Sequence, residues 1–323
     1  MSSFNGPVFI VGLPRSGTKL LRDLLNQNPR IRIPEVETHF IPYLVRKYGV
    51  PPRFEREGLF HSFSNELRQS MFFRYMQEQG HTFNPDDLVR CADLREWSSI
   101  FEYLLRSCGP NGETRDVIFG DKTPDYLEAM DLLKEVFPAA RFLHIIRDPR
   151  DCCLSAARAW GLHPYRTADR WQRIVKAQRG VGRTIGDYME IRYEDLILGT
   201  EEVLRSVCQF LECDYVPEML YLSRSNEKTG DARGRTDIIS DNMNKFWEGF
   251  SERQIRRVEE IAYYQMLDLG YKIYLAEGPR PLKGGMSHVL RGRNFLAFLR
   301  WKAGSRGLVE AVLYFLTRKT RRM

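Results

Sequence analysis

The sequence lacks long hydrophobic runs, although 43% of its 323 residues are hydrophobic. No apolar stretch approaches the ~18 residues that are needed to span a bilayer. The first apolar segment closely follows MSSFNG, without the charged region and apolar stretch that mark a signal peptide. We therefore expect no leader, no N-terminal anchor and no membrane-spanning helix, and the length suits one sizeable globular core.

Cysteine is also scarce, and its spacing excludes the common metal and redox motifs. The six cysteines form no CxxC pair and no metal-ligand pattern. They are Cys91, Cys108, Cys152, Cys153, Cys208 and Cys213. We expect them to be reduced and mostly buried, in keeping with the cytoplasmic location that we predict.

Most of the chain lacks a basic excess. The formal net charge is +7, but residues 288–323 hold nine Lys or Arg and one Glu, which leaves about −1 for the rest. Basicity is thus a property of the tail, and the core gives no reason to expect nucleic-acid binding. The sequence shows no internal repeat and no low-complexity segment.

The most informative stretch runs from Pro7 to Asn28. Residues 8–11 are apolar and predict a short buried parallel strand. Residues 12–17 are too rich in Gly and Pro to be helical, and from Thr18 onward Leu residues recur at helical spacing. A strand, a glycine-rich turn and a helix in this order present backbone N–H groups at a helix N-terminus, which favours an anion site.

This turn differs from the phosphate loop of nucleotide kinases, GxxxxGK[ST]. Gly12 and Gly17 have the kinase spacing, but Thr18 follows the second glycine and Lys19 comes one position later. Arg15 instead places a fixed cation inside the turn, suited to forked phosphate contacts. A plain surface turn is the alternative, but strand, turn and helix agree with one another and favour the anion site.

The sequence PRSGT at residues 14–18 resembles the 5′-phosphosulfate loop of sulfotransferases that use 3′-phosphoadenosine 5′-phosphosulfate (PAPS). It is similar to the form found in tyrosylprotein sulfotransferases and many bacterial relatives. The resemblance implies that the loop binds PAPS through Pro14, Arg15, Ser16, Gly17, Thr18 and Lys19. It also implies a catalytic role for Arg15, whose charge would stabilise the departing nucleotide.

A second segment, Arg147-Asp-Pro-x-x-x-x-x-Ser155, follows an apolar strand at residues 142–146. Ser155 lies about two helical turns beyond the strand end, so both side chains can face one phosphate. In the sulfotransferases that this segment resembles, the Arg and the Ser hold the 3′-phosphate of PAPS, which carries a charge of roughly −1.5 to −2. A salt bridge of Arg147 and a plain helix hydroxyl at Ser155 are the alternatives.

The third segment, Glu-Thr-His-Phe-Ile-Pro at residues 37–42, follows a short strand at residues 31–33. It resembles the Glu-Thr-Arg-x-Ile-Pro of tyrosylprotein sulfotransferases and the Glu-x-His-Phe-Phe of heparan sulfate 3-O-sulfotransferases. In both families the Glu takes the acceptor's proton, which makes Glu37 the candidate base and His39 the second candidate. His39 matches the sugar-modifying pattern, so a carbohydrate, glycolipid or other small acceptor is favoured over peptide tyrosine. The alternatives are that Glu37 is a solvated loop carboxylate and that the His39 ring has only a structural role.

The fourth segment, Asp121 to Tyr126, follows a strand at residues 117–119 and resembles the Glu-Lys-Ser-Pro-x-Tyr of the heparan enzymes. The resemblance assigns Lys122 to stabilise the bridging oxygen as it leaves; a surface lysine is the alternative.

Two weaker candidate sites lie later in the chain. Tyr193 is the last residue of a predicted strand at residues 189–193; it resembles a family Tyr near the nucleotide, or else is a core residue. Arg235 and Thr236 lie where relatives bring a late loop over PAPS. The Ser that tyrosyl enzymes use there is in frame with Arg235, so that role does not transfer.

Strands alternating with helices predict an α/β fold, with a P-loop-like parallel sheet covered by helices on both faces. In such sheets ligands bind at the carboxyl ends of the strands, where every motif lies. We predict a sulfotransferase domain at 1–278 and a basic amphipathic tail at 279–323. A helical insertion at 41–116 would shape the acceptor site. The resemblance covers roughly residues 7–275.

The predicted function is transfer of the sulfuryl group from PAPS to an acceptor hydroxyl, which leaves 3′-phosphoadenosine 5′-phosphate (PAP) and requires no metal. A P-loop kinase acting on a small molecule is one alternative, with Asp121 or Asp148 as Mg²⁺ ligands; the displaced Lys19 counts against it. A non-catalytic nucleotide-binding protein is the other, and the full set of charged candidates counts against that.

Apolar residues of the tail fall in two helical clusters, within 289–301 and 308–316, with basic residues among them. This pattern is typical of an interfacial membrane helix. It predicts a reversible, peripheral contact with the inner face of an anionic membrane and an acceptor linked to that membrane. Packing on the catalytic domain, or on a second subunit in a homodimer, is an equal alternative.

Overall fold

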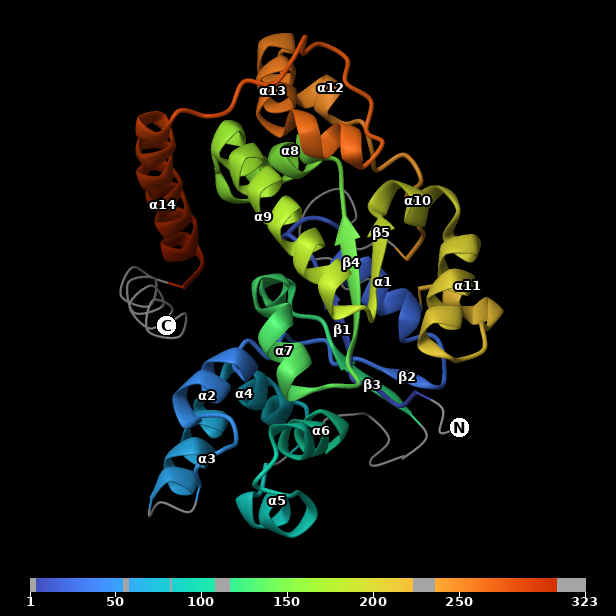
Figure 1. The fold of residues 1–323 in the computed structure, drawn as a ribbon, viewed down its shortest axis with the longest axis vertical. Coiled ribbons are helices and arrows are strands. Elements are labelled where there is room, and N and C mark those ends of the chain that lie inside the picture. The colour runs from blue at the N-terminus through green and yellow to red at the C-terminus, as the bar shows by residue number, and fades with distance from the viewer. Residues whose placement is uncertain (1–3, 55–57, 82, 108–116, 223–235, 307–323) are drawn as a thin grey trace.

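The computed structural model describes residues 4–54, 58–81, 83–107, 117–222 and 236–306, and the statements below concern these. A five-stranded parallel sheet lies at the centre of the molecule (Figure 1). Its strands are β1 (Val8–Val11), β2 (Ile31–Arg32), β3 (Ile118–Asp121), β4 (Arg141–Ile146) and β5 (Tyr188–Arg192). The spatial order is β2-β3-β1-β4-β5. The predicted parallel α/β sheet is confirmed.

Strand β1 occupies the middle of the sheet and pairs on both sides. Val8 lies opposite Gly120 of β3 and Arg141 of β4. A Cβ at Gly120 would lie 2.3 Å from the carbonyl oxygen of Val8, so only glycine allows this close approach. Because both neighbours and both faces are covered, all four residues of β1 are buried, which explains their uniformly apolar sequence.

Helices cover both faces of the sheet, as predicted. Successive β1 residues point to opposite faces, and Val8 and Ile10 belong to one core while Phe9 and Val11 belong to another. The first core includes residues of α1 (Thr18–Leu25), α10 (Tyr193–Leu198) and α11 (Thr200–Leu211). The second includes residues of α6 (Trp97–Ser107), α7 (Met130–Val136), α9 (Pro164–Ile185) and α13 (Glu252–Asp268).

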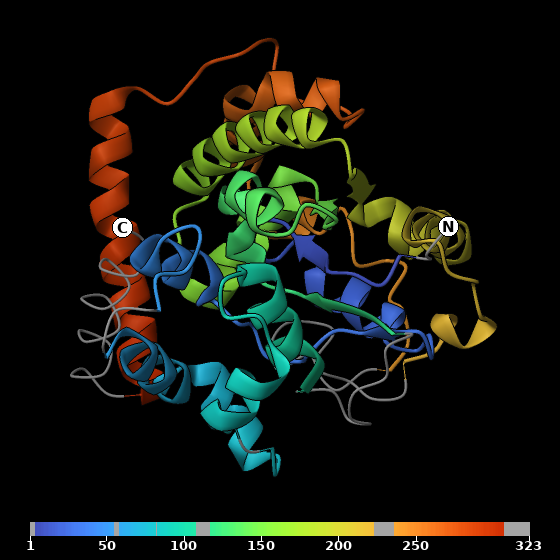
Figure 2. The same ribbon diagram turned by 60° about the horizontal axis from the view of Figure 1, so that its bottom comes forward.

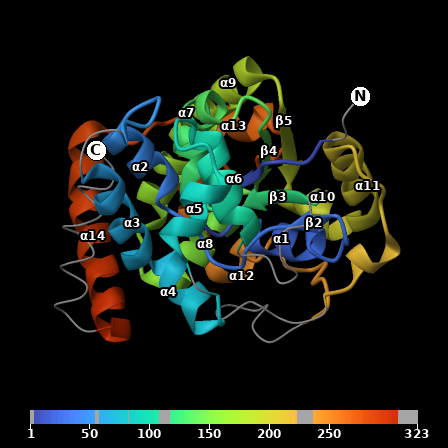
Figure 3. The ribbon, with the colours of Figure 1, turned by 90° about the horizontal axis from the view of Figure 1, so that it is seen from below.

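The helical insertion lies between β2 and β3, at the lower end of Figure 1 and toward the viewer in Figure 3. Besides α6 it comprises α2 (Ile41–Tyr48), α3 (Leu59–Gln69), α4 (Met71–Glu78) and α5 (Pro85–Cys91). Phe40 packs inside the insertion, with its ring centre 5.7–6.1 Å from those of Phe72, Phe73 and Phe101. Phe101 lies 6.1 Å from Phe137, whose ring centre is 5.5 Å from that of Phe9 in β1. The insertion therefore shares the second core and is fixed next to the segment that carries Glu37.

The other predicted helices are present with one difference. The helix expected from Pro124 begins as the 3-10 helix η1 (Pro124–Ala129) and becomes α-helical only in α7, because the amide of Tyr126 bonds Thr123 three residues back. The capping box of Ser251 and Gln254 at the start of α13 is confirmed. The remaining elements are α8 (Pro149–Trp160), η2 (Pro217–Leu220), α12 (Phe246–Gly249) and α14 (Gly284–Arg306).

Helix α14 contains the first apolar cluster of the tail, and the second, within 308–316, lies outside the described residues. No helix in the described ranges is long and apolar enough to cross a membrane.

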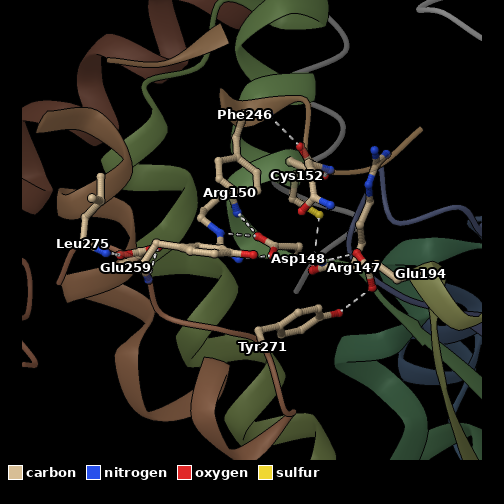
Figure 4. A network of polar contacts seen from close by, with 12 residues as sticks. Arg147, Asp148, Arg150, Cys152, Glu194, Phe246, Glu259, Tyr271 and Leu275 are labelled. Carbon is tan, nitrogen blue, oxygen red and sulfur yellow. Dashed lines mark hydrogen bonds and ion pairs between the residues drawn. The ribbon is translucent and has the colours of Figure 1, made fainter. Parts of the chain in front are cut away.

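A buried ionic network fixes the turn between β4 and α8 (Figure 4). Arg150 donates from Nε and Nη2 to Asp148, at 3.0 and 2.6 Å, and from Nη1 to Glu259 at 2.6 Å. Glu259 is fully buried and also accepts from the backbone N–H groups of residues 274–276, at 2.8–3.1 Å. The network thereby ties α8 to α13 and to the chain beyond it.

We expect Glu259→Ala to lower the free energy of unfolding by about 3–5 kcal/mol, because it leaves Arg150 and three backbone N–H groups without their partner. Chemical denaturation measures this. Glu252→Ala, which changes an exposed carboxylate in the first turn of the same helix, should cost less than about 1 kcal/mol. Equal losses in the two variants would contradict the structural role of the network.

Candidate active site

The loop between β1 and α1 has an unusual backbone. Arg15 and Gly17 have positive φ angles of 76° and 97°, and the amide of Ser16 bonds the carbonyl of Leu13 at 3.2 Å. A Cβ at Gly17 would lie 2.4 Å from the ring of Tyr193, so the loop can lie against that ring only with glycine here. Gly17 also occupies the cap position of α1 and has no side chain, which leaves the first-turn N–H groups of the helix to an anion.

Arg15 points from this loop toward α8. Its Nε donates to the hydroxyl of Ser155 at 2.9 Å, and its guanidinium carbon lies 5.9 Å from the ring centre of Trp160. The structure thus brings Ser155 to the loop through Arg15. Trp160, at the end of α8, is a neighbour that the sequence did not single out.

Arg147, at the end of β4, is buried beside the loop. Its guanidinium lies over the ring of Tyr193 at 4.4 Å and donates to the carbonyl oxygens of Asn242 at 2.7 Å and Arg15 at 3.4 Å. The side-chain amide of Asn242 donates in turn to the Tyr193 hydroxyl at 2.7 Å. Tyr193 therefore belongs to this site, and Asn242 is a further member that no sequence pattern predicts.

Within the described ranges, Arg147 forms no ion pair with a carboxylate, and its Nε has no hydrogen-bond partner. Burial lowers its pKa, but Tyr193, Cys152 and nearby carboxylates outweigh that effect, so its pKa is raised and it stays charged. Such a cation fits a ligand anion.

The carboxylates close to Arg147 form their hydrogen bonds with other groups. Asp148 bonds Arg150, as described above. Glu194 accepts from the amide of Asp148 and the hydroxyl of Tyr271, both at 2.9 Å (Figure 4). Asp151 accepts from the backbone N–H groups of residues 244 and 246, at 2.7 and 3.0 Å. The charges of Asp151 and Glu194 act on Arg147, but neither carboxylate forms an ion pair with it.

The second half of the site joins Glu37, Lys122 and His39. Lys122 Nζ lies 2.5 Å from Glu37 Oε1, and His39 Nε2 lies 2.8 Å from Glu37 Oε2. The Lys122 side chain is only 2% exposed, which excludes the surface lysine considered above. The Glu37 carboxylate is therefore held between a buried cation and a half-exposed imidazole.

The pKa of Glu37 is lowered to about 2. Burial raises it, but the hydrogen bond from His39 and the charge of Lys122 together outweigh burial. Glu37 is therefore ionised at neutral pH and can accept a hydrogen bond or a proton. This arrangement stabilises the fold above the usual pKa of Glu, about 4.3, and the contribution is lost as the pH falls toward 2.

Neighbouring hydroxyls hold these residues together. The amide of Thr38 donates to the Thr123 hydroxyl at 3.1 Å, and the hydroxyls of Thr38 and Tyr126 lie 2.6 Å apart. The amide of Ile41 also donates to the Tyr126 hydroxyl at 3.0 Å. The segment after β2 is thereby attached to the segment after β3, which brings Glu37 to Lys122.

Asp121 lies under this cluster and is fully buried. In the described part of the chain neither of its carboxylate oxygens has a hydrogen-bond partner. Burial raises its pKa to about 6, although the charge of Lys122 opposes the rise.

The other candidates have less defined positions. Thr18 and Ser16 are buried in the loop and at the start of α1, with Ser16 Oγ 3.6 Å from the sulfur of Cys152. Pro14 and Lys19 are partly exposed. Thr236 is exposed, and Arg235 lies outside the described residues. No cluster of His, Cys, Asp or Glu suited to a metal ion occurs in the described ranges.

Comparison with known proteins identifies the family. The model of the sulfotransferase family matches residues 7–217, about two thirds of the chain, so the protein belongs to that family. The match includes both halves of the site.

The chain is also similar to curated relatives. Protein-tyrosine sulfotransferase from Drosophila melanogaster is 26% identical over 248 residues, 74% of this chain and 44% of the relative. Protein-tyrosine sulfotransferase 1 from Danio rerio is 26% identical over 231 residues, 69% of this chain and 58% of the relative. The matched region is about half the length of these relatives.

Solved structures support the fold. The sulfotransferase domain of the curacin biosynthetic pathway has a TM-score of 0.53 at 20% identity and covers 84% of this chain and 100% of its own. That of the Synechococcus PCC 7002 olefin synthase has a TM-score of 0.52 at 21% identity and covers 85% and 98%.

The buried Asp121 carboxyl yields a prediction on pH dependence. Its folded-state pKa lies above the usual 3.9, so wild-type stability should fall, relative to Asp121→Asn, as the pH rises from about 4 to above 6. Denaturation of both proteins across this range measures the difference. Asp131→Asn, at an exposed position, is the control for changing a carboxylate. A difference between Asp121→Asn and wild type that does not vary with pH would contradict the buried, raised pKa.

Proposed function

We propose that the protein transfers the sulfuryl group from PAPS to an acceptor hydroxyl and releases PAP, without a metal ion. The observation that carries this proposal is Arg147, a buried cation that pairs with no carboxylate of the described residues and that contacts the loop containing Arg15. PAPS has phosphates at its 5′ and 3′ positions, so it needs two anion sites. The start of α1 with Arg15 suits one, and Arg147 suits the other.

Each residue then has a distinct task. Arg15 and the loop amides would bind the 5′-phosphate. Arg147 would bind the 3′-phosphate, with Tyr193 and Asn242 fixing its orientation. The Ser155 hydroxyl, which the resemblance assigns to the same phosphate, accepts from Arg15 Nε in this structure. PAPS supplies an activated sulfuryl group. Fixed cations of the protein would stabilise the negative charge that develops on the departing nucleotide.

Lys122 suits the position next to the leaving oxygen. Its ammonium group has three donors, and the contact with Glu37 uses one of them. Since Lys122 is buried, its charge acts through a medium of low polarity and is correspondingly effective.

Glu37 suits the role of base. It is ionised, it is partly accessible, and the bond from His39 orients the carboxylate. A carboxylate with a pKa of about 2 is a weak base, so it accepts the proton late, when bond formation has made the acceptor hydroxyl acidic. The proton can then pass from Glu37 to solvent, because this carboxylate is itself partly exposed.

We propose a carbohydrate, glycolipid or other small hydroxyl compound as the acceptor, in preference to peptide tyrosine. The contact of His39 with Glu37 supports this preference, because it places the residue that resembles the sugar-modifying pattern at the candidate base. The helical insertion would shape the acceptor site, since it begins directly after Phe40. Incubating an extract with labelled PAPS and identifying the labelled product by mass spectrometry tests the acceptor class, and a labelled tyrosine peptide would reverse the preference.

Arg147→Ala should weaken PAP binding about tenfold or more, because losing a charge-assisted contact costs about 1.5–3 kcal/mol. Isothermal titration calorimetry with a chelator present measures this directly. Arg173→Ala, which removes an exposed arginine of α9, is the matched control and should bind PAP like wild type. Arg147→Lys serves if the alanine variant fails to fold. Unchanged PAP affinity would overturn the 3′-phosphate assignment.

Glu37→Gln should retain PAP affinity and lose turnover by about 10²–10⁴-fold, the usual contribution of a general base. A sulfuryl-transfer assay at saturating PAPS measures the loss, with Glu128→Gln on the surface as the control. If Glu37→Gln turns over at the wild-type rate, the base lies elsewhere and His39 is the next residue to change.

A further inference from the structure

Helix α14 packs on the catalytic domain along one side only. Figures 1 and 2 show it at the rim of the molecule, joined to α13 by an extended connection. Leu290 is buried at 6% exposure, the side-chain oxygen of Asn294 accepts from the amide of His163 at 2.7 Å, and Trp301 meets Trp160 edge to face at 6.3 Å. The packed side of α14 therefore faces the start of α9 and the end of α8.

The opposite side of α14 exposes large apolar side chains. Val289 is 68% exposed, Leu296 is 55% exposed, and Phe295 is also exposed. Val289 and Leu296 are seven residues apart and so lie on one line along the helix, with Phe295 beside them. We call these three residues the outer stripe. A contiguous row of exposed apolar side chains is typical of a surface that binds a partner or a membrane.

Basic residues flank the outer stripe. At about 100° per residue, Arg293 and Arg300 lie on one flank, and Arg291 and Lys302 lie on the other. Residues 284–306 contain five Arg or Lys and no Asp or Glu. An apolar stripe between two basic rows suits the boundary between anionic headgroups and acyl chains.

The basic surface extends from α14 onto α9. Burial lowers the pKa of Arg166, and although Asp169 opposes this effect, the charges of Arg173, Arg291 and Arg170 lower it further. The pKa of His163 is likewise lowered, by burial and by Arg293. These shifts show that the positive charges of α9 and α14 lie close enough to act on one another.

Charge complementarity favours an anionic lipid surface over a second copy of the chain. In a symmetric dimer, the outer stripe would bring two equally basic helices together, and the like charges would repel. An anionic bilayer accepts both the apolar stripe and the flanking arginines.

We propose that α14 docks the protein on an anionic lipid surface through the outer stripe and its flanking basic residues. Trp301 contacts Trp160, whose ring lies beside Arg15, so the docked helix adjoins the catalytic loop. The acceptor would then be an amphiphile with a hydroxyl, presented from that surface. Only this last step rests on the proposed sulfotransferase function.

Flotation of the full chain with vesicles tests the docking. Wild type should bind phosphatidylcholine vesicles that contain phosphatidylglycerol, bind phosphatidylcholine alone far less, and detach at high salt. Replacing Arg293 and Arg300 together by Gln should weaken binding about thirtyfold, or about fivefold per charge. The double variant Arg253→Gln/Arg256→Gln, at exposed positions on α13, is the matched control and should bind like wild type. Residues beyond Arg306 stay constant in all variants.

The apolar contribution has its own control. Val289→Ser with Leu296→Ser should weaken binding to the anionic vesicles, whereas Leu198→Ser, an equally exposed change on α10, should not. Wild-type flotation by all α14 variants would overturn the proposal. The proposal would also be overturned if the α14 variants changed their oligomeric state in sedimentation but floated like wild type. That result would mean that the outer stripe contacts a second copy of the chain.

PAP titration in the absence of vesicles separates this proposal from the proposed function. PAP binding without flotation would overturn the docking alone. Flotation without PAP binding would overturn the proposed PAPS-dependent function and leave the docking in place. Loss of flotation with wild-type PAP affinity in the α14 variants is the expected result, because none of the changed residues belongs to the nucleotide site.

Discussion

The burial of Arg147, which has no carboxylate partner among the residues that the structure describes, is the constraint on which the site depends. A buried cation is unfavourable unless an opposite charge reaches it. The nearby carboxylates bond other groups. Asp148 and Glu194 form hydrogen bonds within the turn after β4, and Asp151 accepts from two backbone N–H groups, so none of the three forms an ion pair with Arg147. The ionic network around Arg150 fixes the turn that carries Arg147. The edge of the sheet is therefore positively charged there, and an anionic ligand would neutralise that charge.

In the other half of the site the buried cation is paired with a carboxylate. Glu37 and Lys122 neutralise each other, so the candidate base is ionised and the candidate cation is buried before any ligand binds. Both halves lie at the same edge of the sheet because all five strands are parallel and their carboxyl ends lie along that edge. The loop after β1 occupies the middle of this edge, between the end of β3, which carries Lys122, and the end of β4, which carries Arg147.

The sequence could predict the strands, the loop and the residues at the strand ends, because short apolar runs and Gly-Pro turns act locally. It could not predict contacts between distant segments. Asn242 reaches Tyr193 and Arg147 across the fold, and nothing in its neighbours marks it. The pairing of Ser155 with Arg15, and the place of Trp160 between Arg15 and α14, depend in the same way on tertiary packing.

The proposed 3′-phosphate site at Arg147 can be tested without any substitution. Calorimetric titration of the wild-type protein with PAP and with adenosine 5′-monophosphate, which lacks that phosphate, tests it most directly when a chelator removes divalent metals. We expect PAP to bind at least about tenfold more tightly than adenosine 5′-monophosphate, which is the effect of one charge-assisted contact. Equal affinities for the two nucleotides would contradict it.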